Sequence, residues 1–375
     1  MSRSLFTYLK SPMIKINFIH NNKWPKLSWV AEIKPLDSLI VVYHGPMVEV
    51  GDEWAVEGVW DGSFPAGDFD KSDAIYGTGI RRRGDEIIFV NSSTGVDRLW
   101  YVEVDGISFV GNTLPGILKI TALSLRLDYR YYCYDISSVQ SKGIYSGNKK
   151  IPTTGPNLNI VYYNNIVFNG SFLKEVEKPN NTPILNDYSA YSEFLCRQAT
   201  LLKSNSNHEK RRNNVEMLVG ISSGYDSIAA AVIAKKAGCN ESVSIVNPSS
   251  FWRGSDSGLH IAKILKLNCT ELRHDKLNYR NEVSVWAGSG SDGGRNLTLF
   301  DYPKPLCLFF SGGYGDVVWD LCHRSLVEPR GGLNEMLCEF RLIEGLFITV
   351  VPWWGIRQIN EIQKISHSDE MKSWV

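Results

Sequence analysis

One stretch in the second half of the chain, residues 215–236 with the sequence VEMLVGISSGYDSIAAAVIAKK, constrains the fold most. The apolar run at 217–221 predicts a short buried strand, and the alanine-rich run at 228–237 predicts a helix. The turn between them, residues 222–227, consists of small and polar residues. A strand, a polar turn and a helix in this order present unpaired N–H groups and hydroxyls at the positive end of a helix, which is a favourable position for a phosphate.

Asp226 in this turn indicates what else such a site would hold. Two anions repel each other, so a carboxylate does not bind a phosphate directly. It fits if Mg²⁺ lies between the carboxylate and the phosphates, or if the aspartate only caps the helix. A capped turn in any doubly wound domain therefore stays an alternative to a nucleotide site.

The turn SSGYDS lacks the GxxxxGK[ST] spacing of a Walker loop. It resembles the SGGxDS signature of the PP-loop ATP pyrophosphatases, which split ATP between the α- and β-phosphates and adenylate a substrate. Ser223 stands where that signature has its first glycine. The resemblance implies ATP and Mg²⁺ as cofactors, with Asp226 as a metal ligand and with Ser222, Ser223, Gly224, Tyr225 and Ser227 as nucleotide-binding residues.

A second glycine-containing turn follows an apolar run at residues 306–310. Its sequence, SGGYGD at 311–316, resembles the SGxGxDE loop of asparagine synthetases, which belong to the same superfamily. Val317 takes the place of the glutamate. The resemblance implies that Asp316 shares Mg²⁺ with Asp226 and that Ser311, Gly312 and Gly313 bind the nucleotide.

Two further site residues are expected outside these turns. Asn247 follows the strand predicted at 242–246, where it could bind adenine or ribose. The alternative is that Asn247 is an ordinary turn residue that binds no ligand. Near the C-terminus, residues 339–341 and 351–355 resemble the ExRxPFLD segment of asparagine synthetases. The lysine that this family places beyond that segment has no clear counterpart, and Lys372 is the candidate to substitute for it.

The first half of the chain is expected to be rich in β-strands. Short β-rich segments bounded by Gly, Asn, Asp or Pro predict strands at 38–43, 86–91, 99–104, 107–110 and 159–168, with one helix at 114–127. Four pieces, residues 57–64, 95–101, 109–114 and 151–155, resemble the N-terminal glutaminase-type (Ntn) domain of asparagine synthetases. A generic β-rich domain with similar turns is the alternative.

The glutaminase reaction needs an N-terminal cysteine as its nucleophile. Here Met1 is followed by Ser2, and the first cysteine is Cys133. We therefore expect a degenerate domain without glutamine hydrolysis, which covers the synthetase site or binds a protein partner.

The expected fold class is α/β, in three parts. Residues 1–173 form the β-rich domain, 174–187 a linker, and 188–375 a PP-loop domain with a parallel sheet and helices on both faces, lacking the extreme C-terminal segment of the family. The polar stretch 204–214, SNSNHEKRRNN, is predicted to be a flexible surface loop whose three basic residues, 210–212, are solvated.

Composition excludes several classes of protein. Forty basic and forty acidic residues give a formal charge of zero, which argues against nucleic-acid binding and membrane-surface association. Seven cysteines without CxxC spacing fit a reducing compartment and no structural zinc site. No run of about eighteen apolar residues occurs, so we expect a cytoplasmic protein that does not enter membranes.

The sequence therefore predicts an ATP-dependent ligase that adenylates a small-molecule or peptide substrate, at a carboxylate oxygen, for attack by an amine. A catalytically inactive scaffold that binds a nucleotide or a partner is the first alternative. A PP-loop enzyme that modifies RNA or a deazaguanine precursor is the second.

Overall fold

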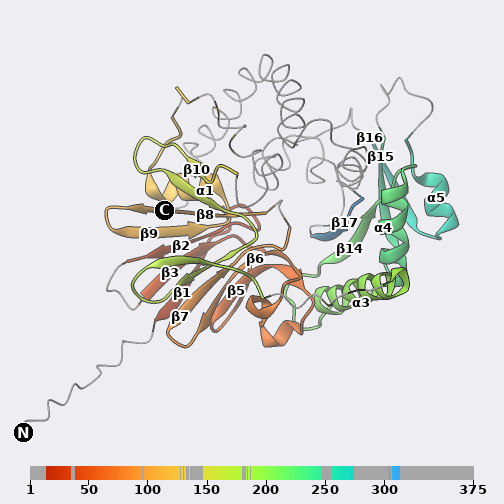
Figure 1. Ribbon diagram of the computed structural model, residues 1–375, viewed down its shortest axis with the longest axis horizontal. Helices are drawn as coiled ribbons and strands as arrows, with labels where there is room; N and C mark the ends of the chain where they lie inside the picture. Colours follow the sequence, from red (N-terminus) through yellow and green to blue (C-terminus); the bar gives the residue numbers. More distant parts are fainter. Residues whose placement is uncertain are drawn as a thin grey trace, which may run out of the picture.

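The computed structural model describes residues 14–34, 39–94, 97–126, 128–129, 131, 135, 147–179, 183, 185, 187–246, 256–273, 304 and 306–312. These residues form a mixed α/β structure with three sheets (Figure 1). Two sheets come from the β-rich N-terminal region, and the third is parallel and comes from residues 216–310. Both the mixed α/β class and the β-rich first half were expected.

The first sheet has seven strands in the order β1-β3-β2-β9-β8-β11-β10. Their bounds are β1 Lys15–His20, β2 Trp29–Ile33, β3 Leu39–His44, β8 Leu99–Val104, β9 Ile107–Gly111, β10 Lys150–Ile151 and β11 Leu158–Val161. All neighbouring pairs are antiparallel except β1 and β3.

The second sheet has six antiparallel strands in the order β13-β12-β7-β6-β5-β4. Their bounds are β4 Glu49–Gly51, β5 Trp54–Trp60, β6 Ile75–Arg83, β7 Glu86–Val90, β12 Asn165–Phe168 and β13 Leu173–Val176. Two short 3₁₀ helices, Phe64–Ala66 and Phe69–Lys71, connect β5 to β6.

Apolar side chains of both sheets share one core, in which Trp29, Ile40, Ile80 and Phe89 are fully buried. The Trp29 and Phe89 rings, from different sheets, stack with their centroids 6.3 Å apart. A second core lies between the first sheet and helix α1, Leu114–Thr121. The burial of apolar surface in these two cores is the main contribution to the stability of this region.

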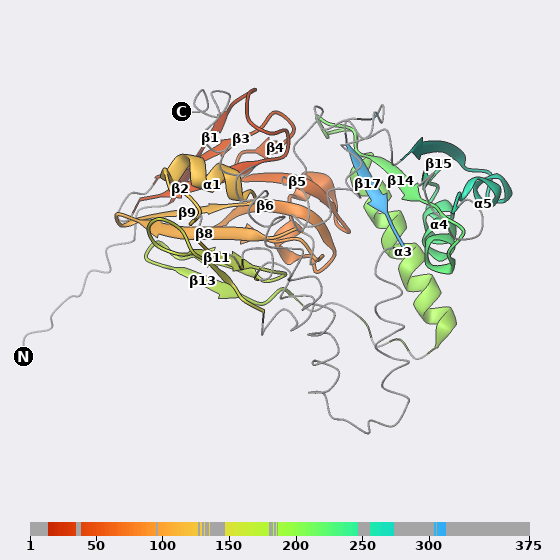
Figure 2. The same ribbon diagram turned by 90° about the horizontal axis from the view of Figure 1, so that it is seen from above.

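The third sheet has four parallel strands in the order β16-β15-β14-β17. These strands are β14 Glu216–Gly220, β15 Glu241–Val246, β16 Asn268–Arg273 and β17 Cys307–Phe310. Three helices accompany them, α3 Tyr188–Ser206, α4 Tyr225–Lys236 and α5 Leu259–Ile264 (Figure 2). Ala231 and Ala234 are buried on the face of α4 that packs into the core. Their small side chains let the helix approach the sheet closely.

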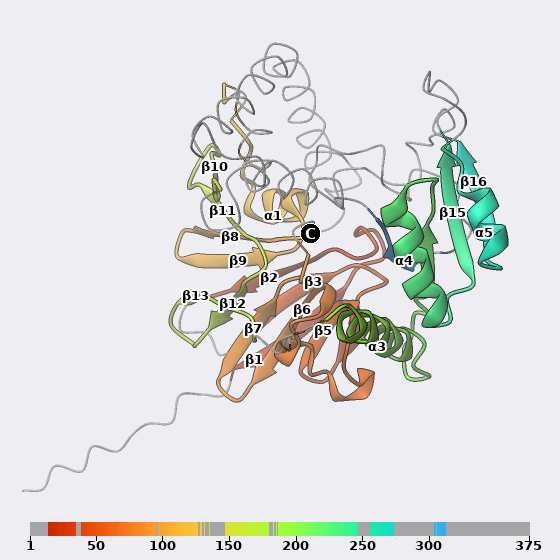
Figure 3. The same cartoon turned by 45° about the vertical axis from the view of Figure 1, so that its right-hand side comes forward.

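Helix α3 joins this third sheet to the N-terminal region. It contacts both β5 and β14, and it lies beside the second sheet (Figure 3). Its N-cap is Asp187, whose carboxylate accepts a hydrogen bond from the backbone N–H of Ala190 at 2.8 Å.

The element boundaries differ from the prediction at three places. Helix α1 ends at Thr121 instead of 127, because Ala122 is left-handed (φ 55°) and Leu125 pairs with Thr153. The strand predicted at 159–168 is two strands, β11 and β12, separated by a turn with Tyr163 at φ 63°. Strand β13 extends to Val176, three residues into the predicted linker, because its backbone pairs with β12.

None of the helices in the described part of the chain combines the length and the apolar character needed to cross a bilayer.

Candidate functional site

The predicted phosphate-binding turn lies between β14 and α4, and its own hydroxyls hold it together. Ser227 Oγ donates a hydrogen bond to the Gly224 carbonyl at 2.8 Å and accepts one from the Ser222 N–H at 3.1 Å. Ser222 Oγ accepts from the Gly224 N–H at 3.2 Å. The first and last residues of the turn are therefore linked, which fixes the direction in which α4 begins.

The first turn of α4 has backbone N–H groups that are unpaired in the described part of the chain. Within the described residues, no acceptor contacts the backbone N–H groups of Tyr225, Asp226 and Ser227. The Tyr225 side chain is 92% exposed, and Asp226 is exposed as well. Unpaired N–H groups at the positive end of a helix attract an anion, so the local chemistry is that of a phosphate or carboxylate site.

Gly312, from the second predicted turn, lies directly against this helix start. A Cβ on Gly312 would be within 2.5 Å of the Asp226 carbonyl carbon, and it would lie closer still to the Ser227 nitrogen. No side chain would fit there. The backbone at residue 312 can contact the start of α4 only because this residue is a glycine. The structure thus brings Gly312 together with the turn after β14.

The position of this contact follows from the strand order. β14 pairs with β15 on one side and with β17 on the other. The strands β15 and β16 are added on one side of β14 and β17 on the opposite side, so the strand order reverses between β14 and β17. In open parallel sheets, a crevice outside the carboxyl ends of the strands forms at such a point, and ligands bind there. Both glycine-containing turns follow the carboxyl ends of these two strands.

A third segment contacts the site, and the sequence did not predict it. Ser223 Oγ donates a hydrogen bond to Asp256 Oδ1 at 2.7 Å, and Ser257 forms an isolated bridge with Ser222. Asp256 and Ser257 both precede α5, which begins at Leu259. An aspartate after a run of polar residues carries no distinctive spacing, so only the three-dimensional structure identifies its contact with the turn.

Four of the predicted site residues, Asn247, Gly313, Asp316 and Lys372, lie outside the described residues. The pairing of Asp226 with Asp316 around Mg²⁺ therefore stays a prediction. Among the residues that the structure describes, no three His, Cys, Asp or Glu side chains are grouped so that they could hold a metal ion.

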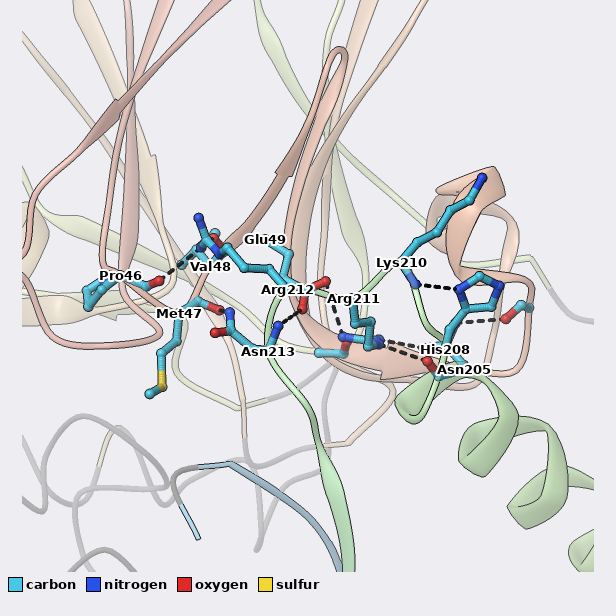
Figure 4. A network of polar contacts seen from close by, with 12 residues as sticks. Pro46, Met47, Val48, Glu49, Asn205, His208, Lys210, Arg211, Arg212 and Asn213 are labelled. Atoms are coloured by element: carbon cyan, nitrogen blue, oxygen red, sulfur yellow. Dashed lines mark hydrogen bonds and ion pairs between the residues drawn. The ribbon is translucent and has the colours of Figure 1, made fainter.

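A second polar cluster joins the N-terminal region to the chain just before β14 (Figure 4). Arg211 is almost fully buried and bonds to backbone carbonyls on both sides of this junction, Gly58 at 2.8 Å and Asn205 at 2.8 Å. Its guanidinium carbon lies 4.4 Å from the centroid of the Phe64 ring. An arginine can make these contacts together because its donors form a planar fork that also stacks on aromatic rings.

The neighbours of Arg211 extend this junction. Arg212 donates to the carbonyls of Pro46 and Val48 at 2.9 Å and 2.7 Å, and the Asn213 N–H donates to Glu49 Oε1 at 3.0 Å. The prediction of a solvated loop at 204–214 is therefore wrong for these residues. Their partners lie far away in the sequence, so composition alone could not reveal them.

A pocket lies at the same junction, between the second sheet and the third. Its lining includes Glu49, Glu57, Tyr76 and Arg211, together with Cys307 and Leu308 of β17. Burial raises the pKa of Glu57, and the nearby Asp97 carboxylate raises it further. Thr78 holds the Glu57 side chain in place through its N–H at 2.8 Å and its hydroxyl at 2.6 Å.

No protein-family model matches this chain, and none of the curated proteins matches it either.

Proposed function

We propose that the chain is an ATP-dependent ligase of the PP-loop type, which forms AMP and pyrophosphate without hydrolysing glutamine. The observation that carries this proposal is the contact between Gly312 and the start of α4 at the carboxyl ends of β14 and β17. Gly312, which belongs to the second predicted turn, lies against the helix start whose N–H donors have no acceptor among the described residues. A generic capped turn needs no second turn against it.

The reaction has two steps in this proposal. A substrate carboxylate oxygen attacks the α-phosphorus of ATP, and the bond to the bridging oxygen of pyrophosphate breaks. An amine then attacks the adenylated carbonyl carbon, and AMP leaves. Ammonia, an amino group of the substrate or an amine on another protein would serve as this amine.

The side chains around the turn fit a polyphosphate with Mg²⁺. The N–H groups of Tyr225, Asp226 and Ser227 would bind phosphate oxygens, and the exposed Asp226 carboxylate is a hard oxygen ligand of the kind Mg²⁺ prefers. Asp316 would be the second ligand. Bound Mg²⁺ would supply charge neutralisation to the departing pyrophosphate.

The chain's own groups would stabilise and orient the substrates. The N–H donors are fixed before binding, because the hydroxyls of Ser222 and Ser227 lock the turn. Fixed donors lose little free energy to reorganisation as negative charge develops, which is the main source of catalysis in phosphoryl and nucleotidyl transfer. The N-terminal sheets would cover this site or bind a protein partner.

Product analysis tests the proposal. We expect the full-length protein, incubated with Mg·ATP, ammonia and a panel of carboxylic acids, to release AMP and pyrophosphate in equal amounts. Asp226→Asn should reduce the rate by about two orders of magnitude, as the loss of one charge-stabilising group does elsewhere. Release of ADP and phosphate instead would contradict the proposal.

A specific observation favours an inactive scaffold as the second candidate. The resemblance expects a glycine at residue 223, whereas Ser223 carries a side chain there and holds an aspartate beside the turn. If ATP binds but no acid or amine gives AMP, the scaffold is the better description.

A further inference from the structure

Residues 256–258 form one wall of the turn that follows β14. The Gly258 N–H donates to Ser244 Oγ of β15 at 2.8 Å, which ties this segment to the sheet. A Cβ on Gly258 would lie 2.6 Å from the carbonyl carbon of Ile221, so the two backbones are in contact. Asp256, at the start of the segment, is thereby held in a fixed position beside the turn.

The hydrogen bond from Ser223 brings a carboxylate to this turn in addition to that of Asp226. None of the ion pairs formed among the described residues involves Asp226 or Asp256. The turn therefore combines N–H donors, which attract an anion, with two carboxylates, which repel one and which no cation among the described residues pairs with.

The bond also decides where the Ser223 hydroxyl points. A glycine would leave the space over the N–H groups open, whereas a serine can rotate its hydroxyl into that space. Donation to Asp256 at 2.7 Å holds the hydroxyl on the side of residues 256–258. A charge-assisted hydrogen bond of this kind is about twice as strong as a neutral one.

We infer that Asp256 is a positioning residue of the nucleotide site: through Ser223 it keeps the turn open, and its charge makes polyphosphate binding depend on a divalent cation. This inference rests on the proposed function, since it concerns the same turn. It adds a residue that neither turn motif contains.

Binding measured by titration calorimetry tests the charge, with ATP offered either with excess Mg²⁺ or with EDTA. Asp256→Asn keeps an oxygen acceptor for Ser223 and removes the charge. We expect its affinity for metal-free ATP to rise about tenfold, with a much smaller change for Mg·ATP, because one repulsive charge is lost. Asp52→Asn, an exposed acid in the turn between β4 and β5, is the matched control and should leave both affinities unchanged.

Hydrogen exchange of the hydrogen-bonded amides of Ser222, Gly224 and Ile228 tests the positioning. We expect faster exchange in Ser223→Ala and Asp256→Ala, which lose the hydrogen bond, and wild-type exchange in Asp256→Asn, which retains it. Circular dichroism checks that each variant folds.

The outcomes separate this inference from the proposed function. If the wild-type protein binds no ATP with or without Mg²⁺, the proposed function fails and this inference fails with it. If the wild-type protein binds ATP but Asp256→Asn has the same ratio of metal-free to Mg·ATP affinity, only this inference is overturned. Unchanged hydrogen exchange of the turn amides in Ser223→Ala would also overturn this inference.

Discussion

Arg211 and Glu49 form a buried ion pair between the two halves of the chain, with 3.6 Å between Nη1 and Oε2 and with side chains only 3% and 5% exposed. Burial lowers the pKa of Arg211 to about 10 and raises the pKa of Glu49, because both charges have left water. Each charge therefore depends on its partner, since an isolated buried charge is costly.

Removal of Arg211 should destabilise the whole protein. We expect Arg211→Ala to lower the free energy of unfolding by about 3–5 kcal/mol, because Glu49 then stays buried without its partner. Urea denaturation followed by tryptophan fluorescence measures this. Lys210→Ala, at the neighbouring exposed residue, should change the free energy by less than about 0.5 kcal/mol. Equal effects of the two changes would contradict the assignment of the junction to Arg211.

Glu57 should make stability fall as the pH rises. Its pKa is raised in the folded state by burial, so the folded protein binds its proton more tightly than the unfolded chain does. The stability that this proton contributes is present in acid and is lost as the pH passes through the raised pKa. We expect Glu57→Gln to remove about 1–2 kcal/mol of the difference in unfolding free energy between pH 5 and pH 8.

The control for Glu57 is Glu103→Gln, because Glu103 is exposed. This variant should keep the wild-type pH profile of unfolding. A Glu57→Gln profile identical to that of the wild-type protein would show that Glu57 does not titrate differently on folding.

Lys178 should have the opposite pH dependence. It is buried, its Nζ donates to the Asn91 carbonyl at 2.6 Å and to Asn165 Oδ1 at 3.1 Å, and burial lowers its pKa to about 7. The unfolded chain then binds more protons between about pH 7 and the ordinary lysine pKa near 10.5, so stability rises with pH in that window. Lys178→Met should flatten this rise, by on the order of 3 kcal/mol. A rise that persists in the variant would contradict the shift.

Gly312 should tolerate no side chain. We expect Gly312→Ala to lower the free energy of unfolding by about 1–3 kcal/mol, because its Cβ would overlap the backbone at Asp226 and Ser227. Gly224→Ala is the matched control in the same site, since its Cβ would be 3.4 Å from its nearest neighbour, Ser222 Oγ, at a φ of −77°. It should have little effect on stability. Similar losses in both variants would argue against the close contact.

Local patterns predicted the elements whose type is set by the character of their own residues. The run at 217–221 predicts a strand because β14 is a central strand of a parallel sheet, and strands buried on both faces of such a sheet are continuously apolar. The strands at 99–104 and 107–110 form a hairpin around Asp105 and Gly106, both at positive φ, so their turn is encoded locally.

The remaining features depend on contacts that no local pattern encodes. Arg211 has the sequence context of a solvated loop, yet it is buried because Glu49 and the Gly58 carbonyl come from the other half of the chain. Asp256 lies beside the turn only because Gly258 brings its backbone onto Ile221. The turn was therefore predictable as a unit, whereas the groups that surround it were not.

The place of β17 in the sheet has a consequence for the folding of the protein during its synthesis on the ribosome. β17 pairs with β14, but the ribosome synthesises β15, α5 and β16 after β14 and before β17. A nascent chain can therefore complete the turn after β14 long before Gly312 emerges to pack against the start of α4. If the proposed function holds, growing chains should acquire affinity for the nucleotide only after translation has passed β17.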